Sequence, residues 1–115
     1  MEKVTDRFLR YVQIDTQSDE EGTGTPTTEK QHELARLLVE ELTKMGAEEI
    51  TYDKEHCYVY ASIPATEGME GKPVMGFISH MDTSPAVSGA NVRPRIITAS
   101  VSYTHLRAHE TTLHL

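Results

Sequence analysis

The sequence is short of cysteine and of positive charge, and both shortages exclude classes of protein. Cys57 is the single cysteine, so the chain cannot form an internal disulfide, and one thiol suits a reducing compartment. Lysine and arginine number 11 against 18 aspartate and glutamate, which leaves a net charge of −7. A nucleic-acid-binding surface would show clustered basic residues instead. We therefore expect a cytoplasmic protein without a nucleic-acid partner.

Long apolar runs, internal repeats and low-complexity tracts are also missing. No run approaches the roughly 20 apolar residues that a helix needs to cross a bilayer. The first residues, Met1–Thr5, lead straight into a charged amphipathic segment, unlike a signal peptide. With 115 residues the chain is long enough for one modest domain, and we expect no membrane partner.

Apolar residues recur at helical spacing near the N-terminus. Val4, Phe8 and Val12 predict a short amphipathic helix over residues 4–14. The following residues 17–28 are polar and contain glycine and proline, which form turns, so they predict a loop.

A second and longer helix is predicted over residues 28–45. Thr28 and Gln31 have the spacing of a capping box at its start, and Gly46 is expected to end it as a C-terminal cap. An apolar stripe runs along this helix and consists of Leu34, Leu37, Leu38, Leu42 and Met45. We interpret the stripe as core packing.

Two short alternating segments predict a β-hairpin. One strand lies within residues 49–53 and the second covers residues 57–63, with a polar turn between them. We expect His56 to be exposed to solvent, because it lies in that turn. Cys57 has no nearby basic residue that would lower its pKa, so we interpret it as a buried structural thiol.

The segment that carries the chemistry begins with residues 74–79. Their unbroken apolar run predicts a strand buried on both faces, as in a mostly parallel α/β sheet. His80 and Asp82 follow at the carboxyl end of the strand, where such sheets bind ligands. Because alternate residues of a strand share a face, we expect the two side chains to leave on the same side.

His80 and Asp82 are therefore the candidate site residues. A neutral imidazole is a good ligand for zinc, copper or nickel, and a carboxylate often holds its second ring nitrogen. We assign His80 as the metal ligand and Asp82 as the catalytic residue that orients it. The alternative is a small non-catalytic binding module in which the two residues only form a hydrogen-bonded pair, because isolated pairs at this spacing are common.

A resemblance to a known family favours the metal-ligand assignment. Gly76–Pro85, followed by Ser88–Val92, resembles the first metal-ligand segment of the M20 family of two-zinc peptidases. The Thr-Ser-Pro run resembles the tripeptide aminopeptidases of that family, with its dipeptidases and deacylases as alternatives. Asp6–Val12 with Asp15–Ser18 resembles the opening of the same enzymes, and the resemblance covers about residues 1–97.

The resemblance implies an α/β fold and a larger enzyme. Residues 1–98 would be the N-terminal part of a zinc-peptidase catalytic domain, with two helices, a hairpin and one buried strand of a mixed sheet. The full-length enzyme would hold two zinc ions (Zn2+) per subunit, release the N-terminal residue from tripeptides and form a homodimer. Of its machinery this chain carries one zinc ligand, His80, and the orienting Asp82, so we expect the chain alone to be inactive.

The incomplete sheet leads us to expect that the chain alone folds poorly. A strand of residues 74–79 without neighbours would leave an unpaired edge and an exposed apolar face. Such a surface favours aggregation.

Residues 99–115 depart from the family pattern, and we expect them to be a non-native tail. Residues 101–111 resemble the translation of a transposon adaptor used in sequencing libraries. His105 and His109 stand four residues apart, as two ligands on one helix face would, but Glu110 is not between them as in the zinc-protease motif. A metal site needs several fixed ligands, so we predict none in the tail.

Overall fold

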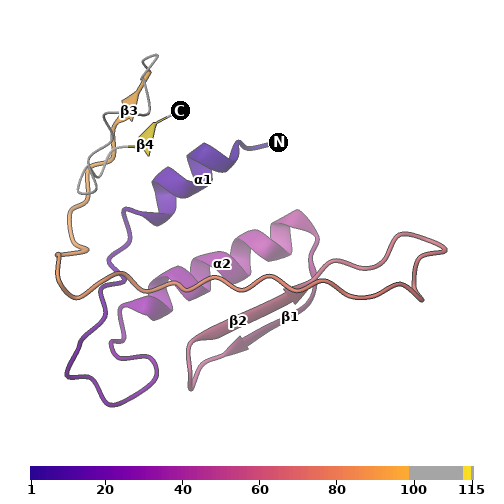
Figure 1. Cartoon of the computed structure of the whole chain (residues 1–115), viewed down its shortest axis with the longest axis horizontal. Coiled ribbons are helices and arrows are strands. Elements are labelled where there is room, and N and C mark those ends of the chain that lie inside the picture. The colour runs from indigo at the N-terminus through magenta and orange to yellow at the C-terminus, as the bar shows by residue number, and fades with distance from the viewer. Residues whose placement is uncertain (99–112, 115) are drawn as a thin grey trace.

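The computed structural model describes residues 1–98 and 113–114. Figure 1 shows its elements, which are α1 (Val4–Tyr11), α2 (Gln31–Met45), β1 (Glu48–Asp53), β2 (Tyr58–Ser62), β3 (Ile96–Ile97) and β4 (Leu113–His114). They confirm the predicted α/β class. Neither helix in this part of the chain is long and apolar enough to cross a bilayer. The predicted tail, with His105 and His109, lies outside the described residues except for β4.

Helix α2 packs against the β1–β2 hairpin, and this contact forms a small core. Leu34 and Ala35 on α2 and Cys57 at the hairpin are the buried apolar residues of the described chain. Gly46 follows α2 in the left-handed conformation, with a φ of 84°, which glycine adopts without steric cost. The predicted helix and its glycine cap are therefore confirmed, although Met45 at the end of the stripe stays exposed.

The start of α2 differs from the prediction. The helix begins at Gln31, and Lys30 in the N-cap position makes no side-chain hydrogen bond to the first turn. Gln31 Nε2 donates instead to Thr28 Oγ1 at 3.1 Å, while the Thr28 hydroxyl donates to the backbone oxygen of Gln17 at 2.8 Å. The predicted capping box is wrong because Thr28 uses its hydroxyl to tether the preceding loop.

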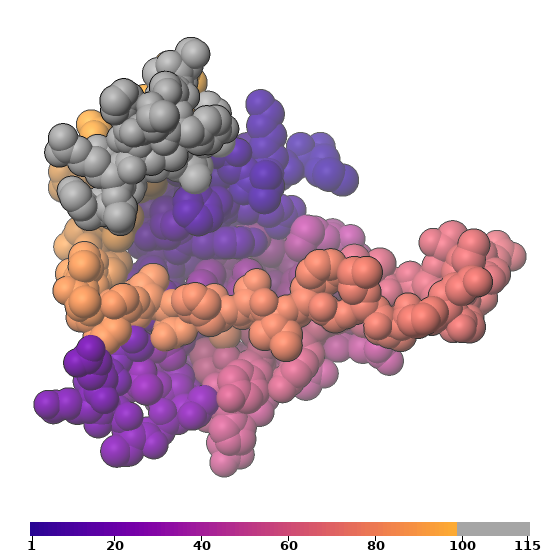
Figure 2. Space-filling view, viewed as in Figure 1, coloured from indigo at the N-terminus to yellow at the C-terminus, as the bar shows by residue number. Residues whose placement is uncertain are grey.

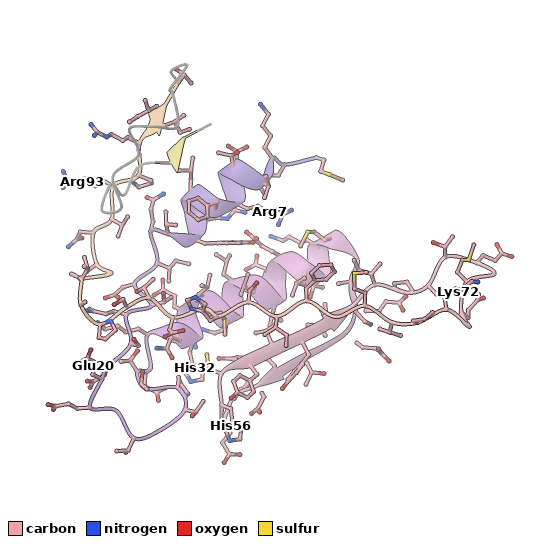
Figure 3. The ribbon with its side chains drawn as sticks, viewed as in Figure 1. Arg7, Glu20, His32, His56, Lys72 and Arg93 are labelled. Atoms are coloured by element: carbon pink, nitrogen blue, oxygen red, sulfur yellow. The ribbon has the colours of Figure 1, made fainter. Side chains whose placement is uncertain are left out.

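A charged network centred on Glu41 attaches α1 to α2. Figure 3 labels one of its members, Arg7 on α1. Arg7 Nη1 donates to the buried Glu41 carboxylate at 3.0 Å, Arg10 Nε donates at 2.7 Å, and the Tyr11 hydroxyl donates as well. Burial alone would raise the pKa of Glu41, but the hydrogen bonds from Tyr11 and Arg10 and the arginine charges hold it below its ordinary value. Helix α1 confirms the first predicted helix and ends earlier, at Tyr11.

Strands β1 and β2 pair antiparallel, as predicted, with Asp53 opposite Tyr58. Asp53 shapes the turn because its Oδ1 accepts hydrogen bonds from the N–H groups of Glu55 and His56, at 3.1 and 3.2 Å. Cys57 has a φ of 59°, a left-handed conformation that keeps it out of the strand, so β2 begins one residue later than predicted. Cys57 is buried, and burial raises the pKa of its thiol, as expected of a structural cysteine.

Residues 74–79 are not a buried strand, and the sequence prediction is wrong here. They run extended over one side of the molecule, where Figure 2 shows an exposed ridge, and Phe77 is 89% and Ile78 100% exposed. No strand among the described residues pairs with them. An apolar run is buried only where neighbouring elements cover it. The exposed apolar face expected of an incomplete sheet is therefore present, and the radius of gyration of 17.2 Å exceeds the ~13 Å of a compact 100-residue domain.

We predict that Glu41→Gln loosens α1 from α2. The substitution keeps the shape of the side chain but removes the charge that Arg7 and Arg10 share, and losing charged hydrogen bonds costs about 1–3 kcal/mol. Amide hydrogen exchange within α1 should become about tenfold faster or more. Glu40→Gln is the matched control, because Glu40 pairs with Lys44 on the exposed face. Equal exchange rates in the two variants would contradict the role of Glu41.

The same network predicts a pH dependence. Because the folded chain lowers the pKa of Glu41 below its ordinary value of about 4.5, the unfolded carboxylate binds more protons in this range. The stabilisation is complete above about pH 4.5 and is lost as the pH falls through the folded pKa. The NMR chemical shifts of α1 should report this loss in the unaltered chain and not in Glu41→Gln.

Candidate functional site

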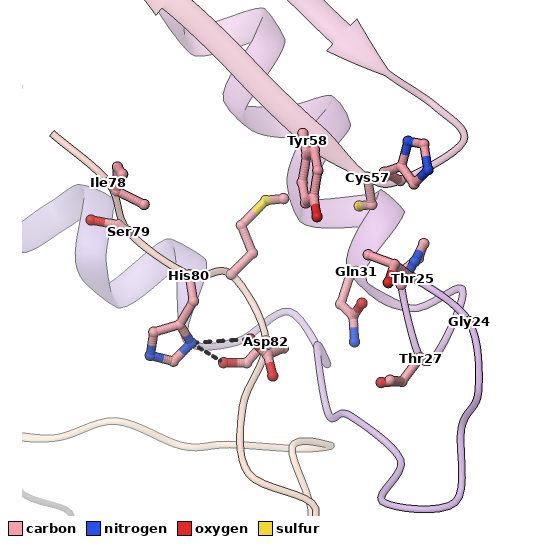
Figure 4. A pocket seen from close by; sticks show the side chains of 13 residues that line it. Gly24, Thr25, Thr27, Gln31, Cys57, Tyr58, Ile78, Ser79, His80 and Asp82 are labelled. Carbon is pink, nitrogen blue, oxygen red and sulfur yellow. Dashed lines mark hydrogen bonds and ion pairs between the residues drawn. The ribbon is translucent and has the colours of Figure 1, made fainter. Parts of the chain in front are cut away.

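His80 and Asp82 contact each other, as the sequence predicts. His80 Nδ1 lies 2.9 Å from the backbone oxygen of Asp82 and 3.1 Å from its Oδ1. Figure 4 marks the contacts between the two residues with dashed lines. The two side chains are 85% and 46% exposed. Because the residues are only two positions apart, their contact forms without a completed sheet.

The partners of His80 Nδ1 decide where the ring carries its proton. A backbone carbonyl oxygen only accepts hydrogen bonds, so the contact with Asp82 requires an N–H at Nδ1. In the neutral ring Nε2 then bears the lone pair, and no described residue hydrogen-bonds to it. His80 thus presents an oriented nitrogen outward, as metal-binding histidines do.

One histidine does not make a metal centre. Zinc sites use three or four protein ligands. Within the described part of the chain, no group of three or more histidine, cysteine, aspartate or glutamate residues could hold a metal ion. His80 fits as a single ligand, and a metal bound there would need further ligands from outside the described residues.

A cavity of about 400 Å³ opens beside the pair (Figure 4). Its walls come from residues 78–82, the loop 24–27, Gln31 and the hairpin residues 56–58. His56 lies there but is held by Asp53, whose Oδ2 is 2.9 Å from Nδ1 and whose hydrogen bond and charge raise the pKa of His56. The exposed, aspartate-paired His56 confirms the expectation of a solvated histidine. No motif or periodicity in the sequence indicates that the loop 24–27 lies at the site.

A short parallel bridge holds the loop after Asp82. The Thr83 N–H donates to the Thr16 oxygen at 3.1 Å, and the Ser18 N–H donates to the Thr83 oxygen at 3.0 Å. Gln17 Nε2 also donates to the backbone oxygen of Pro85 at 3.0 Å. Sequence reasoning missed these contacts, because no periodicity links two segments so far apart in the chain.

Known proteins resemble the chain over most of its length. No protein-family model matches it. It is 54% identical over 95 residues to Peptidase T of Parabacteroides distasonis, 47% over 98 residues to Peptidase T of Alkaliphilus oremlandii, and 48% over 96 residues to Peptidase T of Geobacillus thermodenitrificans. The chain is similar to Peptidase T. These matches cover 83–84% of the chain but only 23–24% of the relatives, the coverage expected of an N-terminal fragment.

We predict that neutral His80 carries its proton on Nδ1. The two oxygen acceptors of Asp82 favour that tautomer and leave Nε2 bare. Long-range ¹H–¹⁵N NMR correlations distinguish the two ring nitrogens directly. Asp82→Asn should keep the Nδ1–H form, because the backbone oxygen still accepts, whereas a proton found on Nε2 of the unaltered chain would contradict the geometry.

Proposed function

We propose that residues 1–98 are the N-terminal part of a zinc-dependent tripeptide aminopeptidase. The observation that supports this most is the His80–Asp82 pair, an imidazole oriented through Nδ1 with Nε2 facing outward. It occurs in a chain similar to Peptidase T over most of its length. The buried single cysteine, Cys57, fits a cytoplasmic location for this enzyme.

Each residue of the pair has a distinct role in this proposal. His80 would hold zinc through Nε2, and Asp82 fixes the tautomer and the orientation of the ring. When bound, zinc would lower the pKa of a water molecule and polarise the scissile carbonyl. The cavity of about 400 Å³ beside the pair offers room for part of a small peptide.

The rest of the enzyme would complete the fold as well as the site. Another cavity, of about 470 Å³, lies between Tyr58–Tyr60 of β2 and the extended segment that contributes Phe77–Ser79 and Met81. Within the described residues β2 pairs only with β1, and the facing segment pairs with no strand. Unpaired backbone edges beside apolar side chains are typical of an interrupted sheet. We therefore propose that the chain alone, with one zinc ligand and an open sheet, has no peptidase activity.

We also propose that residues 99–115 are a tail foreign to the enzyme. The matches to the relatives extend over 95–98 residues and leave the remainder of this 115-residue chain unmatched. The resemblance of residues 101–111 to translated adaptor sequence supports the same division.

The proposed function predicts the behaviour of a chimera. Residues 1–98 would replace the matching stretch of Peptidase T from Parabacteroides distasonis, which is 54% identical to this chain. We expect the chimera to bind zinc and to release the N-terminal residue from tripeptides. His80→Ala should abolish activity and lower the bound zinc, and Asp82→Asn should weaken zinc affinity by about 10–100-fold.

Asp6→Asn is the matched control for Asp82→Asn, because Asp6 is exposed on α1 and makes no contact with the pair. It should leave zinc content and activity within about twofold, the scale of a neutral surface change. A folded chimera that keeps full zinc and activity after His80→Ala would contradict the proposed function. That result would favour a non-catalytic binding module.

A further inference from the structure

Within the described residues, the segment that carries His80 is hydrogen-bonded to the preceding part of the chain at one place. Among the described residues, every hydrogen bond between residues 73–98 and residues 1–72 joins Thr16, Gln17 or Ser18 to Thr83 or Pro85. We call these five residues the clamp. No ion pair crosses between the same two parts of the described chain.

The clamp includes a tightly packed contact. Thr16 is 2% exposed, and Gly89 is buried beside Asp15 and Gln17. A Cβ added at Gly89 would lie 2.7 Å from Asp15 Oδ1, closer than side chains tolerate, and 3.2 Å from Thr83 Oγ1, a tight approach. A side chain at this position therefore has to displace Asp15 Oδ1, the atom that accepts the hydrogen bond from the Gln17 N–H.

The clamp is also anchored to α2. Asp15 Oδ1 accepts a hydrogen bond from the Gln17 N–H at 3.0 Å, and Lys30 Nζ lies 3.1 Å from Asp15 Oδ2. Lys30 is the residue that immediately precedes α2. Because α2 packs on the hairpin, the clamp holds Thr83 at a fixed position relative to the small core between α2 and the hairpin.

We propose that the clamp positions His80 for metal binding, and this inference rests on the proposed function. Thr83 directly follows Asp82, whose backbone and side-chain oxygens both hold His80 Nδ1. A shift of Thr83 moves both acceptors and rotates the imidazole. Gln17 and Gly89 are thus positioning residues that act through Asp82 without touching the metal or the substrate. A displacement near 1 Å is enough to reduce catalysis about 100-fold.

The first test uses the 115-residue chain and two matched substitutions. Gln17→Glu replaces the amide that donates to Pro85 with a carboxylate that repels its oxygen. Gln13→Glu is the control, because Gln13 donates to the Leu9 oxygen at the end of α1, away from the clamp. We expect amide exchange at Thr83 to become about tenfold faster in Gln17→Glu only, with α2 unchanged. Equal rates in the two variants, or an unprotected Thr83 amide in an unaltered chain whose α2 amides are protected, would overturn the proposal.

A second pair of variants tests the packing by an independent route. Gly89→Ala should loosen the clamp and speed amide exchange at Thr83, because its Cβ collides with Asp15 Oδ1, the acceptor of the Gln17 N–H. Gly71→Ala, where a Cβ meets nothing within 4 Å, should leave Thr83 protected. Protection of Thr83 that survives Gly89→Ala would contradict the tight contact.

The third measurement separates positioning from a merely structural role. In the chimera with the Parabacteroides distasonis relative, Gln17→Glu should lower kcat and zinc affinity by about 10–100-fold while KM for the tripeptide stays within about twofold. Gln13→Glu should change neither. An unaltered chimera that folds without peptidase activity would argue against the proposed function. An active chimera in which Gln17→Glu behaves like Gln13→Glu would overturn the clamp alone.

Discussion

The pairing of Thr83 with Thr16 and Ser18 is the contact on which the position of the candidate site depends. The segment around it carries some of the most exposed apolar side chains of the described chain, including Phe77 and Ile78. Apolar packing therefore does little to place this segment. Backbone hydrogen bonds at Thr83 hold the segment instead. Because hydrogen bonds are directional, they fix which residues of the segment lie beside Thr16 and Ser18, which exposed apolar surface could not do.

The hairpin, α1 and the clamp are all attached to helix α2 or to the residue that precedes it. Leu34 and Ala35 face the hairpin, Glu41 holds the arginines of α1, and Lys30 just before the helix pairs with Asp15 beside the clamp. The three contacts are apolar packing, charged hydrogen bonds and an ion pair, and they involve different positions along the helix or just before it. This 15-residue helix with its glycine cap therefore connects the parts of a chain that has only a small apolar core.

Local features were predictable from the sequence, and contacts distant in the sequence were not. Helix α2 and the hairpin follow from apolar periodicity and turn residues, and the His80–Asp82 contact follows from spacing. The burial of residues 74–79 was predicted wrongly, because an apolar run reports a preference for burial and not the presence of covering elements. Glu41 resembles any solvated helix carboxylate in the sequence, and only the docking of α1 reveals its role.

The most direct test of the central claim is to sequence the genomic DNA across codons 95–115 with primers that span this junction. We expect the reading frame to continue past residue 98 into the remaining roughly three quarters of a coding sequence, as the 23% coverage of the relative implies. That continuation should encode the further histidine and carboxylate ligands that His80 needs. A frame that reproduces residues 99–115 and then stops would contradict the claim, because a two-zinc site could not form with His80 as its single identified ligand.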